Sequence, residues 1–351
     1  MNIIELHILQ SYPVSCLNRD DLGAPKSATF GGYSRARLSS QCLKRAQREL
    51  FKEMAPEFAQ GQRTKLLVSS FSKLIEERDG VAQEHPKLAE TLAALWGKSD
   101  AKKKDANGNA KATTLTFLSP GEMNVMIDTA LSCYEQGREK DLSKEVLKAL
   151  KGVTRKDGAD IAFFGRMVAD EPSLNVEGAA MFSHALSTHR AEPEMDFYSA
   201  IDDLQPSDES GAGMTGVLEF SSACYYRYIG VNLDLLKENL RGVEDIEIKE
   251  ILAAFIKSAL ESVPSARKNS MNAFTRPGYV LGLRRSSTQP IQLVNAFEKP
   301  IRPQNGYLEP SEEALKAEWK NISEKWGLAA DCLVEMPEVS ESEFIKKLLE
   351  I

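Results

Sequence analysis

The sequence predicts an α+β fold in which a large helical segment interrupts a sheet. A short apolar run near the start has the composition of a strand, residues 56–180 have helical periodicity, and the chain from residue 181 is again strand-like. At 351 residues the chain can bury a sizeable core, and more than one module is expected.

The first predicted strand is the run IIELHIL, residues 3–9, which is rich in Ile and Leu and is followed by polar residues and Pro13. Residues 17–37 are predicted to form a loop, because glycine and proline recur in them. A helix is expected to begin near Ser39 or Ser40, since either hydroxyl can cap its first free N–H groups.

Residues 56–180 are predicted to form a helical insertion. In TKLLVSSFSKLIEERD, apolar residues recur on one stripe: Leu67, Phe71, Leu74 and Ile75. A later helix opens with a capping box, in which Ser119 is the cap, Pro120 takes the first helical position and Glu122 completes the box. Residues 97–114 are poor in apolar side chains and rich in Lys, Asn and Gly, which predicts a loop.

Two strand-like runs follow, residues 179–204 and 216–233, and the polar, glycine-rich QPSDESGAGMTG joins them. This pattern predicts a long hairpin. The next predicted elements are a helix and two strands: 245–261, 278–286 and 291–297.

The succession of strand, helix, strands, helix and strand is typical of a ferredoxin-like or RNA-recognition-like core. We therefore expect a core made from residues 1–55 and 181–310, with the hairpin at about 190–218. The insertion occupies 56–180, and two further helices are expected in a C-terminal segment, 311–351.

Charge and cysteine content exclude several classes of protein. A formal net charge of −7 argues against indiscriminate coating of nucleic acid, so a nucleic-acid site must be a local patch. The 5 cysteines are scattered without a C-x-x-C pair, which suits reduced thiols and argues against a disulfide framework or structural zinc. The N-terminal residues make a poor signal peptide and no apolar run could span a bilayer, so we expect a soluble, cytoplasmic protein without a membrane partner.

The first predicted helix has one cationic face. At 100° per residue, an arc of about 100° holds Gln41, Lys44, Arg45, Arg48 and Lys52. The opposite side is apolar: Leu43, Ala46, Leu50 and Met54. Cations in the first turns oppose the helix macrodipole, and no carboxylate lies four residues from Lys44, so helix stability does not explain them. A bound anion would explain them; the alternative is a solvated basic face.

Further cations lie before and far beyond this helix. The preceding loop contributes Arg19, Lys26, Arg35 and Arg37. Residues 262–297 contain no Asp or Glu and hold Arg267, Lys268, Asn269, Phe274, Arg276, Tyr279, Arg284 and Arg285. So many positive groups favour a polyanion with regularly spaced phosphates. For Arg284 and Arg285, a basic strand edge that prevents edge pairing is nearly as good an interpretation.

The predicted hairpin is acidic. Between Arg190 and Arg227 there is no Lys or Arg, and eight carboxylates occur: Glu192, Glu194, Asp196, Asp202, Asp203, Asp208, Glu209 and Glu219. Separate acidic and basic zones on one molecule would suit head-to-tail contacts between copies. The alternative is a solvated loop.

Motifs for catalysis or cofactors are weak or absent. The run GAGMTG, Gly211 to Gly216, formally matches a dinucleotide fingerprint but lacks the strand before it and the helix after it. The four histidines have no metal-ligand spacing. Asp20 and Asp21 could hold Mg²⁺ near a phosphodiester, although adjacent carboxylates on a loop are more often turn formers. No cofactor or metal is expected.

The run PVSCLNRDDLGAPKSATFGGYSRARLSSQCLKRA closely resembles the N-terminal signature of the CasC family, the backbone subunit of the type I-E CRISPR surveillance complex Cascade. DIAFFGRMVAD, VEGAAMFSHALSTHRAEPEMDFYSAIDDL and ARKNSMNAFTRPGYVLGLR are similar to that family in the expected order. The resemblance implies a modified RNA-recognition palm, helical fingers and a hairpin thumb. Copies would stack as a helical filament on one CRISPR RNA, beside other Cascade subunits, and present the guide for pairing with a target DNA strand.

The resemblance also implies roles for particular residues. Those expected to hold phosphates and sugars are Arg19, Lys26, Ser39, Ser40, Gln41, Lys44 and Arg48. Phe163, Arg166 and Met167 would lie against RNA at a kink, with Met167 as an apolar wedge, although a core methionine is an equal alternative. Phe197 and Tyr198 would press on a displaced base, with one of them expected to pack inside the hairpin. The aromatic pattern of ordinary RNA-recognition domains is missing, so stacking on the sheet face is not expected.

Three function classes stay open at this point. The resemblance favours a subunit that is not an enzyme and that binds RNA through its backbone. Related backbone subunits of other CRISPR types cut target RNA at regular intervals through an aspartate, and Asp20 or Asp21 could act in that way. A free-standing RNA-binding protein is the third class.

Overall fold

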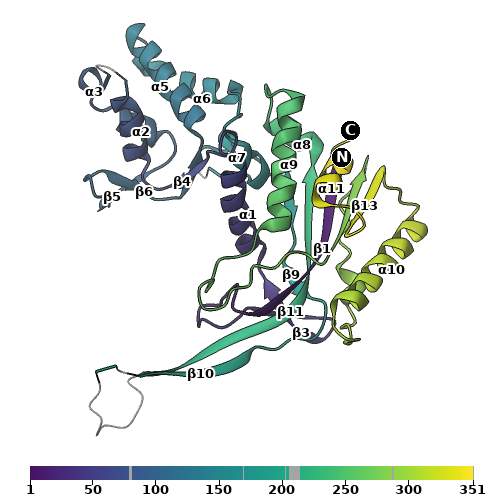
Figure 1. Ribbon diagram of the computed structural model, residues 1–351. Helices are drawn as coiled ribbons and strands as arrows, with labels where there is room; N and C mark the ends of the chain where they lie inside the picture. The colour runs from purple at the N-terminus through teal and green to yellow at the C-terminus, as the bar shows by residue number, and fades with distance from the viewer. Residues whose placement is uncertain (79–80, 169, 202, 205–213, 287, 351) are drawn as a thin grey trace. The chain divides into compact units, whose positions relative to one another are not determined.

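The computed structural model describes residues 1–78, 81–168, 170–201, 203–204, 214–286 and 288–350 (Figure 1). The chain forms two compact units. The first contains Met1–Leu50, Met181–Gly230 and Phe255–Ile351; the second contains Phe51–Ala180 and Val231–Ala254. Residues 231–254, which the sequence analysis assigned to the core, therefore belong to the second unit.

The first unit is built on a sheet. Among the described residues it has nine strands, seven of them in the order β13-β12-β1-β11-β9-β3-β2, while β10 and β8 pair with β11. Their bounds are β1 Ile3–Ser15, β2 Ser27–Phe30, β3 Tyr33–Leu38, β8 Ala180–Phe182, β9 Ala185–Ser187, β10 Glu194–Ala200, β11 Met214–Asn232, β12 Tyr279–Arg285 and β13 Cys332–Met336. The helices of the central succession are α1 Ser40–Met54 and α9 Asp245–Glu261. The chain follows the predicted order of strand, helix, strands, helix and strand with one exception. Residues 17–37, predicted to form a loop, contain β2 and most of β3, which pair with each other before α1 begins.

Strand β1 is longer than predicted. It pairs antiparallel with β12 from Ile3 to Leu9 and then continues through Pro13 to Ser15. The extension has a neighbour in the long strand β11, whose Ser222 hydroxyl donates to the Tyr12 carbonyl at 3.3 Å. The strand therefore continues past the proline because β11 lies beside it, and this neighbour cannot be seen from the sequence alone.

Helix α1 packs against α9 through a polar side chain. Gln47 is 1% exposed, and its Nε2 donates to the Phe255 carbonyl at 3.1 Å. Leu43 and Phe51 are buried at the same helical spacing as Gln47, whereas Leu50, expected on the apolar face, is only half-buried. A buried amide that is hydrogen-bonded can take a core position, so the buried face differs from the predicted one.

Two arginines predicted to lie at a strand edge or a binding surface belong to an internal strand of the sheet. β12 lies between β1 and β13, so it is not an edge strand. Arg285 is 1% exposed and its Nε donates to Glu5 at 2.6 Å, while Arg284 donates to the Leu348 carbonyl at 3.2 Å. Strand β13, which the sequence did not predict, pairs with β12 on this side, so the strand-edge interpretation is wrong for both arginines. The binding interpretation is wrong for the buried Arg285, whereas Arg284 is half-buried.

The C-terminal segment contains the two expected helices, α10 Leu308–Trp326 and α11 Glu341–Leu349. Helix α11 packs closely on β12. The Phe344 ring lies so near Gly282 that a Cβ there would come within 2.5 Å of it. The strand predicted at 291–297 is instead an irregular segment that ends in a short helix, η3 Val294–Phe297.

Strands β10 and β11 pair antiparallel from Glu194 with Phe220 to Ala200 with Met214, in agreement with the predicted hairpin. The connection 205–213, which holds Asp208, Glu209 and the first half of GAGMTG, lies outside the described residues, as does Asp202.

The second unit is mainly helical, as predicted. Its helices are α2 Leu67–Glu76, α3 Val81–Glu84, α4 Leu88–Ala94, α5 Pro120–Glu135, η1 Glu139–Asp141, α6 Leu142–Gly152, α7 Ala159–Phe164, η2 Pro172–Leu174 and α8 Leu233–Asn239. Small sheets pair β4 Gln62–Thr64 with β7 Thr116–Leu118, and β5 Ser99–Lys104 with β6 Ala110–Ala112. The β5–β6 pair replaces part of the predicted loop 97–114. The predicted capping box of Ser119 and Glu122 is present.

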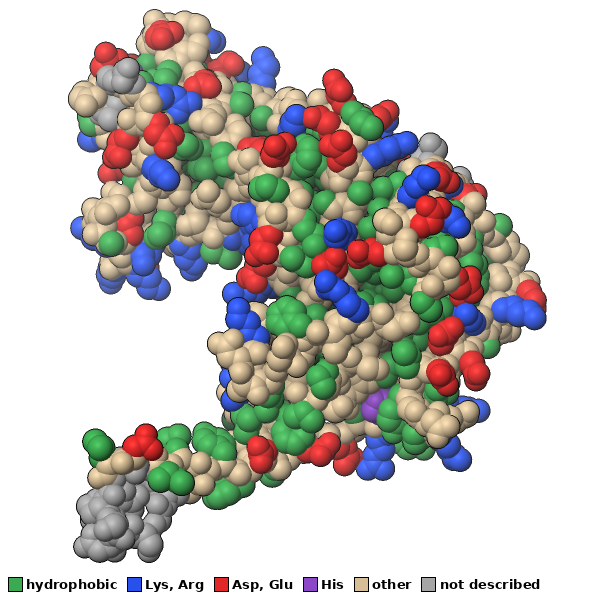
Figure 2. Space-filling model, in the orientation of Figure 1, with side chains coloured by type: hydrophobic (Ala, Val, Ile, Leu, Met, Phe, Trp, Pro, Cys, Tyr) green, Lys and Arg blue, Asp and Glu red, His purple; other side chains and the backbone are tan. Residues whose placement is uncertain are grey.

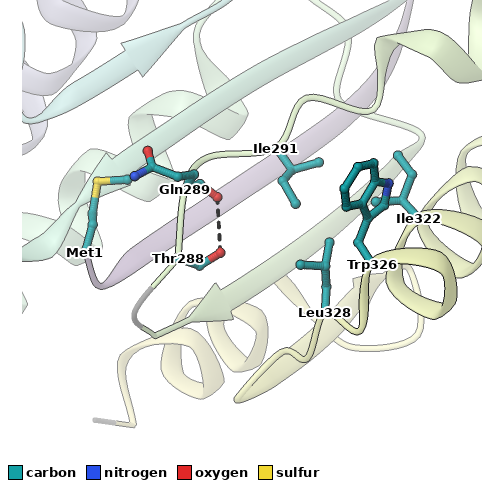
Figure 3. A pocket seen from close by; sticks show the side chains of 7 residues that line it. All are labelled: Met1, Thr288, Gln289, Ile291, Ile322, Trp326 and Leu328. Atoms are coloured by element: carbon teal, nitrogen blue, oxygen red, sulfur yellow. Dashed lines mark hydrogen bonds between the residues drawn. The ribbon is translucent and has the colours of Figure 1, made fainter.

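One recess of the first unit is mainly apolar (Figure 3). It is lined by Met1, Thr288, Gln289, Ile291, Ile322, Trp326 and Leu328. None of these residues has a charged side chain, so the recess is distinct from the cationic face of α1. Across the described ranges, no helix combines the length and apolar character needed to cross a membrane.

Candidate nucleic-acid interface

The start of helix α1 is capped by Ser39. Its Oγ accepts the Cys42 N–H at 3.3 Å, its own N–H donates to Asn18 at 2.8 Å, and the residue is 7% exposed. The Ser40 N–H donates to Nδ1 of His184 at 3.2 Å. Ser39 therefore serves the helix rather than RNA, which contradicts its predicted contact, while Ser40 is half-buried at the surface.

Cations gather around this helix start. The Arg37 N–H donates to the Lys26 carbonyl at 2.9 Å, and both side chains are partly exposed. Burial lowers the pKa of His184, and the charges of Arg37 and Lys26 lower it further. Two predicted cations and a helix N-terminus thus produce one positive region. His184 was not predicted as part of this region, because no spacing in the sequence connects it to Ser40.

The exposed face of α1 carries most of the predicted side chains. Gln41 is exposed, Arg48 is half-buried, and the Lys44 ammonium lies 5.2 Å from the ring centroid of Phe182. Arg45 is exposed but forms an ion pair with Glu49 at 2.9 Å. Because a carboxylate balances its charge, Arg45 is the weakest anion ligand of this face.

The structure brings the two basic segments of the sequence together. One recess is lined by residues 17–23 and by Ala266, and a second is lined by α1 residues and by residues 264–266. Burial raises the pKa of Cys16, while Arg267 and Arg19 both lower it, so the two arginines lie near one thiol. Segments about 250 residues apart in sequence therefore lie near each other. We use the name basic groove for the cationic and polar residues of these two segments and of the neighbouring face of α1: Arg19, Lys26, Arg37, Ser40, Gln41, Lys44, Arg48, Arg267, Lys268 and Asn269.

The later segment contributes unequally. Lys268 and Asn269 are exposed. Arg267 has φ of 54°, in the left-handed region that arginine seldom adopts, and its buried Nε has no hydrogen-bond partner among the described residues. Arg276 is tied to Glu261 by an ion pair of 2.9 Å, so its predicted RNA contact would compete with this pair.

Arg35 is not part of the basic groove. It is 0% exposed, and its guanidinium donates to the carbonyls of Ser187 at 2.9 Å and Phe297 at 2.7 Å. Its predicted phosphate contact is therefore wrong. The reason is tertiary: the main chain at residues 297–298 covers it.

In the second unit, only one of three predicted contact residues reaches the surface. Phe163 is 0% exposed and Arg166 is 6% exposed, so their predicted RNA contacts are wrong. Met167 is 81% exposed, which excludes the alternative of a core methionine. Arg166 pairs with the buried Glu122 at 2.7 Å and holds the chain that displays Met167.

The hairpin exposes apolar side chains on both faces, and exposed apolar side chains are visible along it in Figure 2. Phe197 is 68% exposed and Tyr198 is 43% exposed, so the expectation that one packs inside is wrong. The hairpin has only two strands here, and Tyr198 instead lies over Gly216, where a Cβ would meet its ring at 2.6 Å. The sequence analysis missed neighbouring exposed residues: Met195, Ile201, Leu204, Met214 and Val217. An alternation of apolar residues along the strands was the available signal.

The candidate catalytic pair is part of a turn. Asp20 Oδ1 accepts the N–H groups of Leu22 at 2.9 Å and Ala24 at 3.0 Å, which is a turn-forming role. Asp21 is exposed beside it. Over the part of the chain that the structure describes, no group of three or more His, Cys, Asp or Glu side chains is placed to hold a metal ion.

The sequence model of the CT1975-like protein family, Cas_CT1975, matches residues 4–348. A solved chain of a CRISPR RNA-guided surveillance complex, described as pre-nicking, is 30% identical with a TM-score of 0.77, over 93% of this chain and 90% of that chain. A second chain of a CRISPR RNA-guided surveillance complex has a TM-score of 0.62 at 22% identity, over 99% and 98% of the two chains, and shows likeness of fold. Comparison with curated proteins finds no match.

Proposed function

This chain belongs to the family of CT1975-like proteins, and we propose that it is the repeated backbone subunit of a type I-E CRISPR surveillance complex, Cascade. In this proposal it binds the CRISPR RNA through the sugar-phosphate chain and presents the guide for pairing with a target DNA strand. Its likeness in sequence and fold to a chain of a CRISPR RNA-guided surveillance complex supports the assignment.

One observation carries the proposal: the basic groove. Residues 17–23 and residues 264–266 meet beside the cationic face of α1, although the whole chain is acidic. A local positive surface beside a helix N-terminus suits phosphates. It also suits an RNA-binding protein whose overall charge disfavours indiscriminate binding.

The mechanism follows from what these side chains can recognise. Ammonium and guanidinium groups of Lys26, Arg37 and Arg48 neutralise phosphates and read no base. Sequence recognition is then left to base pairing by the RNA, as expected for guided recognition. Met167 and Phe197, whose exposed apolar side chains can pack on unstacked bases, would act where the RNA is kinked.

The sheet of the first unit would be the palm, the helical unit the fingers and the β10–β11 hairpin the thumb. A two-stranded hairpin that exposes apolar side chains on both faces is poorly stable in water without a partner. In the proposed assembly that partner is the next copy of the chain, and further Cascade subunits complete the particle in the cytoplasm.

We propose no catalytic role for this subunit. Asp20 supports the turn at residues 20–24, and its conservative variant D20N could keep the same hydrogen bonds. Assembled particles incubated with Mg²⁺ and complementary RNA should leave that RNA intact. Regular fragments that disappear in D20A or D21A particles would instead identify a ribonuclease.

The proposal is tested by purifying the tagged chain from cells that express a CRISPR array and companion subunits, followed by sizing and sequencing of the bound RNA. The wild-type chain should yield a large particle with RNA of one defined length. The double variant K26A/R37A should lose most of the RNA. The matched control is R190A, because Arg190 is an exposed arginine paired with Glu192. A stable, RNA-binding monomer without companion subunits would contradict the proposal.

A further inference from the structure

We infer that the second unit contains a binding site for a single phosphate group, centred on Arg155. The site lies in a recess of about 320 Å³. Its lining includes Lys151, Arg155, Glu177, Glu238 and Arg241. It is separate from the basic groove, and the inference does not depend on the proposed function.

Positive charge is in excess among the buried side chains around Glu122. Arg155 and Arg166 are 9% and 6% exposed, and both face the single carboxylate of Glu122. Arg166 approaches one oxygen at 2.7 Å, whereas Arg155 reaches the other only through Nε at 3.4 Å. Buried charges are costly unless they are paired, and here one carboxylate serves two guanidinium groups.

The terminal nitrogens of Arg155 have donor capacity that Glu122 does not use. Within the described part of the chain, its side chain makes only the hydrogen bond to Glu122. The two terminal nitrogens are not among the buried atoms without a partner, and Arg155 lines the recess, so these donors face it. A planar guanidinium with both terminal nitrogens available is suited to a bidentate oxyanion.

Two further cations, Lys151 and Arg241, lie in the same lining as Arg155. Arg241 donates to the Lys151 carbonyl, which brings both side chains to the same rim. Burial lowers the pKa of Arg155, and the charges of Arg166 and Arg241 lower it as well, whereas Glu122 raises it. An anion in the recess would relieve this repulsion, as a counterion does for other buried arginines.

The carboxylates of the lining restrict the size of the ligand. Glu177 and Glu238 are exposed residues of the lining and would repel a strand of many phosphates. Three cations against two carboxylates still favour one discrete anion. We assign the ligand class as phosphate, either inorganic or the terminal group of a nucleoside monophosphate, whose hydroxyls could donate to the carboxylates.

The test uses the full chain and titration calorimetry with three probes: inorganic phosphate, AMP and a short DNA duplex. We expect saturable 1:1 binding of phosphate or AMP, and the probe with the lower Kd identifies the source of the phosphate. R155M should raise the Kd about tenfold or more, because a bidentate charged contact is lost. R241Q should raise the Kd severalfold. Because Arg241 is exposed, this variant also tests the site if R155M folds poorly.

The matched control is K148Q, an exposed lysine on the same helix as Lys151 that does not line the recess. Its Kd should equal that of the wild type. Three results would overturn the inference: no saturation beyond what sodium chloride gives at equal ionic strength, unchanged phosphate binding in both R155M and R241Q, or loss of binding in K148Q alone. Tighter binding of the duplex than of either small probe would also overturn it, because the recess would then belong to a polyanion surface.

Discussion

Arg166 and Glu122 form a buried ion pair: Nη1 of Arg166 lies 2.7 Å from Oε2 of Glu122, and both side chains are 1% exposed. The same guanidinium donates to the carbonyls of Leu174 at 3.0 Å and Phe117 at 3.1 Å. These contacts fix the segment in which the next residue, Met167, is 81% exposed. The pair thus connects the stability of the second unit to the display of one surface side chain.

The first prediction concerns this pair. R166M should destabilise the second unit by about 3 kcal/mol, because Glu122 loses its closer guanidinium partner and the carbonyl acceptors lose their donor. Glu122 then keeps the longer contact with Arg155 and the Ser119 N–H. Differential scanning calorimetry should show a lower Tm for the transition of that unit. R45A removes an exposed pair with Glu49 and should change stability by less than about 1 kcal/mol. Equal effects of the two variants would refute the anchoring role of Arg166.

Sequence reasoning found several elements of the fold because their signals are local. The apolar run at residues 3–9, the capping box of Ser119 and Glu122, and the two strand-like runs of the hairpin each arise from neighbours along the chain. It failed where tertiary contacts decide. Strand β13 and the buried position of Arg285 depend on β12 having a neighbour on each side.

The same distinction applies to the site. Arg35 and Arg37 have the same position in the strand alternation, yet only Arg35 is covered, by the carbonyls of Phe297 and Glu298. Likewise, Arg166 and Met167 are adjacent but differ in exposure from 6% to 81%. A sequence motif contains both residues of such a pair. Only the packing around them shows which one is buried, such as Arg166, and which one is exposed, such as Met167.

The second prediction tests the basic groove. K44A should weaken RNA binding for every guide sequence, because the proposed contact of its ammonium group is to a phosphate, which carries no sequence information. The slope of log K against log salt should fall by about 0.7, the value for one phosphate of a single strand. Filter binding at several salt concentrations with two unrelated guides measures both quantities. A loss that depends on the guide, with an unchanged slope, would contradict this role for Lys44.

The third prediction concerns Met167. If it packs on an unstacked base, M167A should weaken target binding by about 1–3 kcal/mol while the Tm of the free chain stays the same. Binding of complementary DNA to assembled particles measures the first quantity. L115A is the control, since Leu115 is another exposed apolar residue of this unit, at 57% exposure. Normal target binding by M167A particles would show that the exposed methionine has another role.

The fourth prediction concerns the hairpin. F197S should leave the free chain as stable as the wild type, because the side chain is 68% exposed and adds little to the core. It should reduce the yield of large particles severalfold, since the proposed contact with the next copy loses an aromatic anchor. Size-exclusion chromatography with light scattering measures the particle. S199A, which changes a polar residue on the same face of β10, should assemble normally.

The fifth prediction concerns His7, a buried residue of β1. A hydrogen bond of 2.9 Å joins its Nδ1 to the Tyr226 hydroxyl, which also accepts the Leu293 N–H at 2.9 Å. Nε2 of His7 has no hydrogen-bond partner among the described residues. Burial lowers the pKa of His7 to about 3, and the charge of Arg285 lowers it further.

The unfolded chain has an ordinary histidine pKa of about 6.5, so between that pH and about pH 3 the unfolded state binds one more proton. Stability should therefore fall as the pH decreases through this window, with His7 contributing about 1.4 kcal/mol per pH unit. H7F removes the titrating imidazole, and its free energy of unfolding should be lower at pH 7 because the Tyr226 hydroxyl loses a hydrogen-bond partner. That free energy should also depend less steeply on pH from 6 to 4. Parallel profiles for H7F and the wild type would show that His7 does not control the acid sensitivity of this unit.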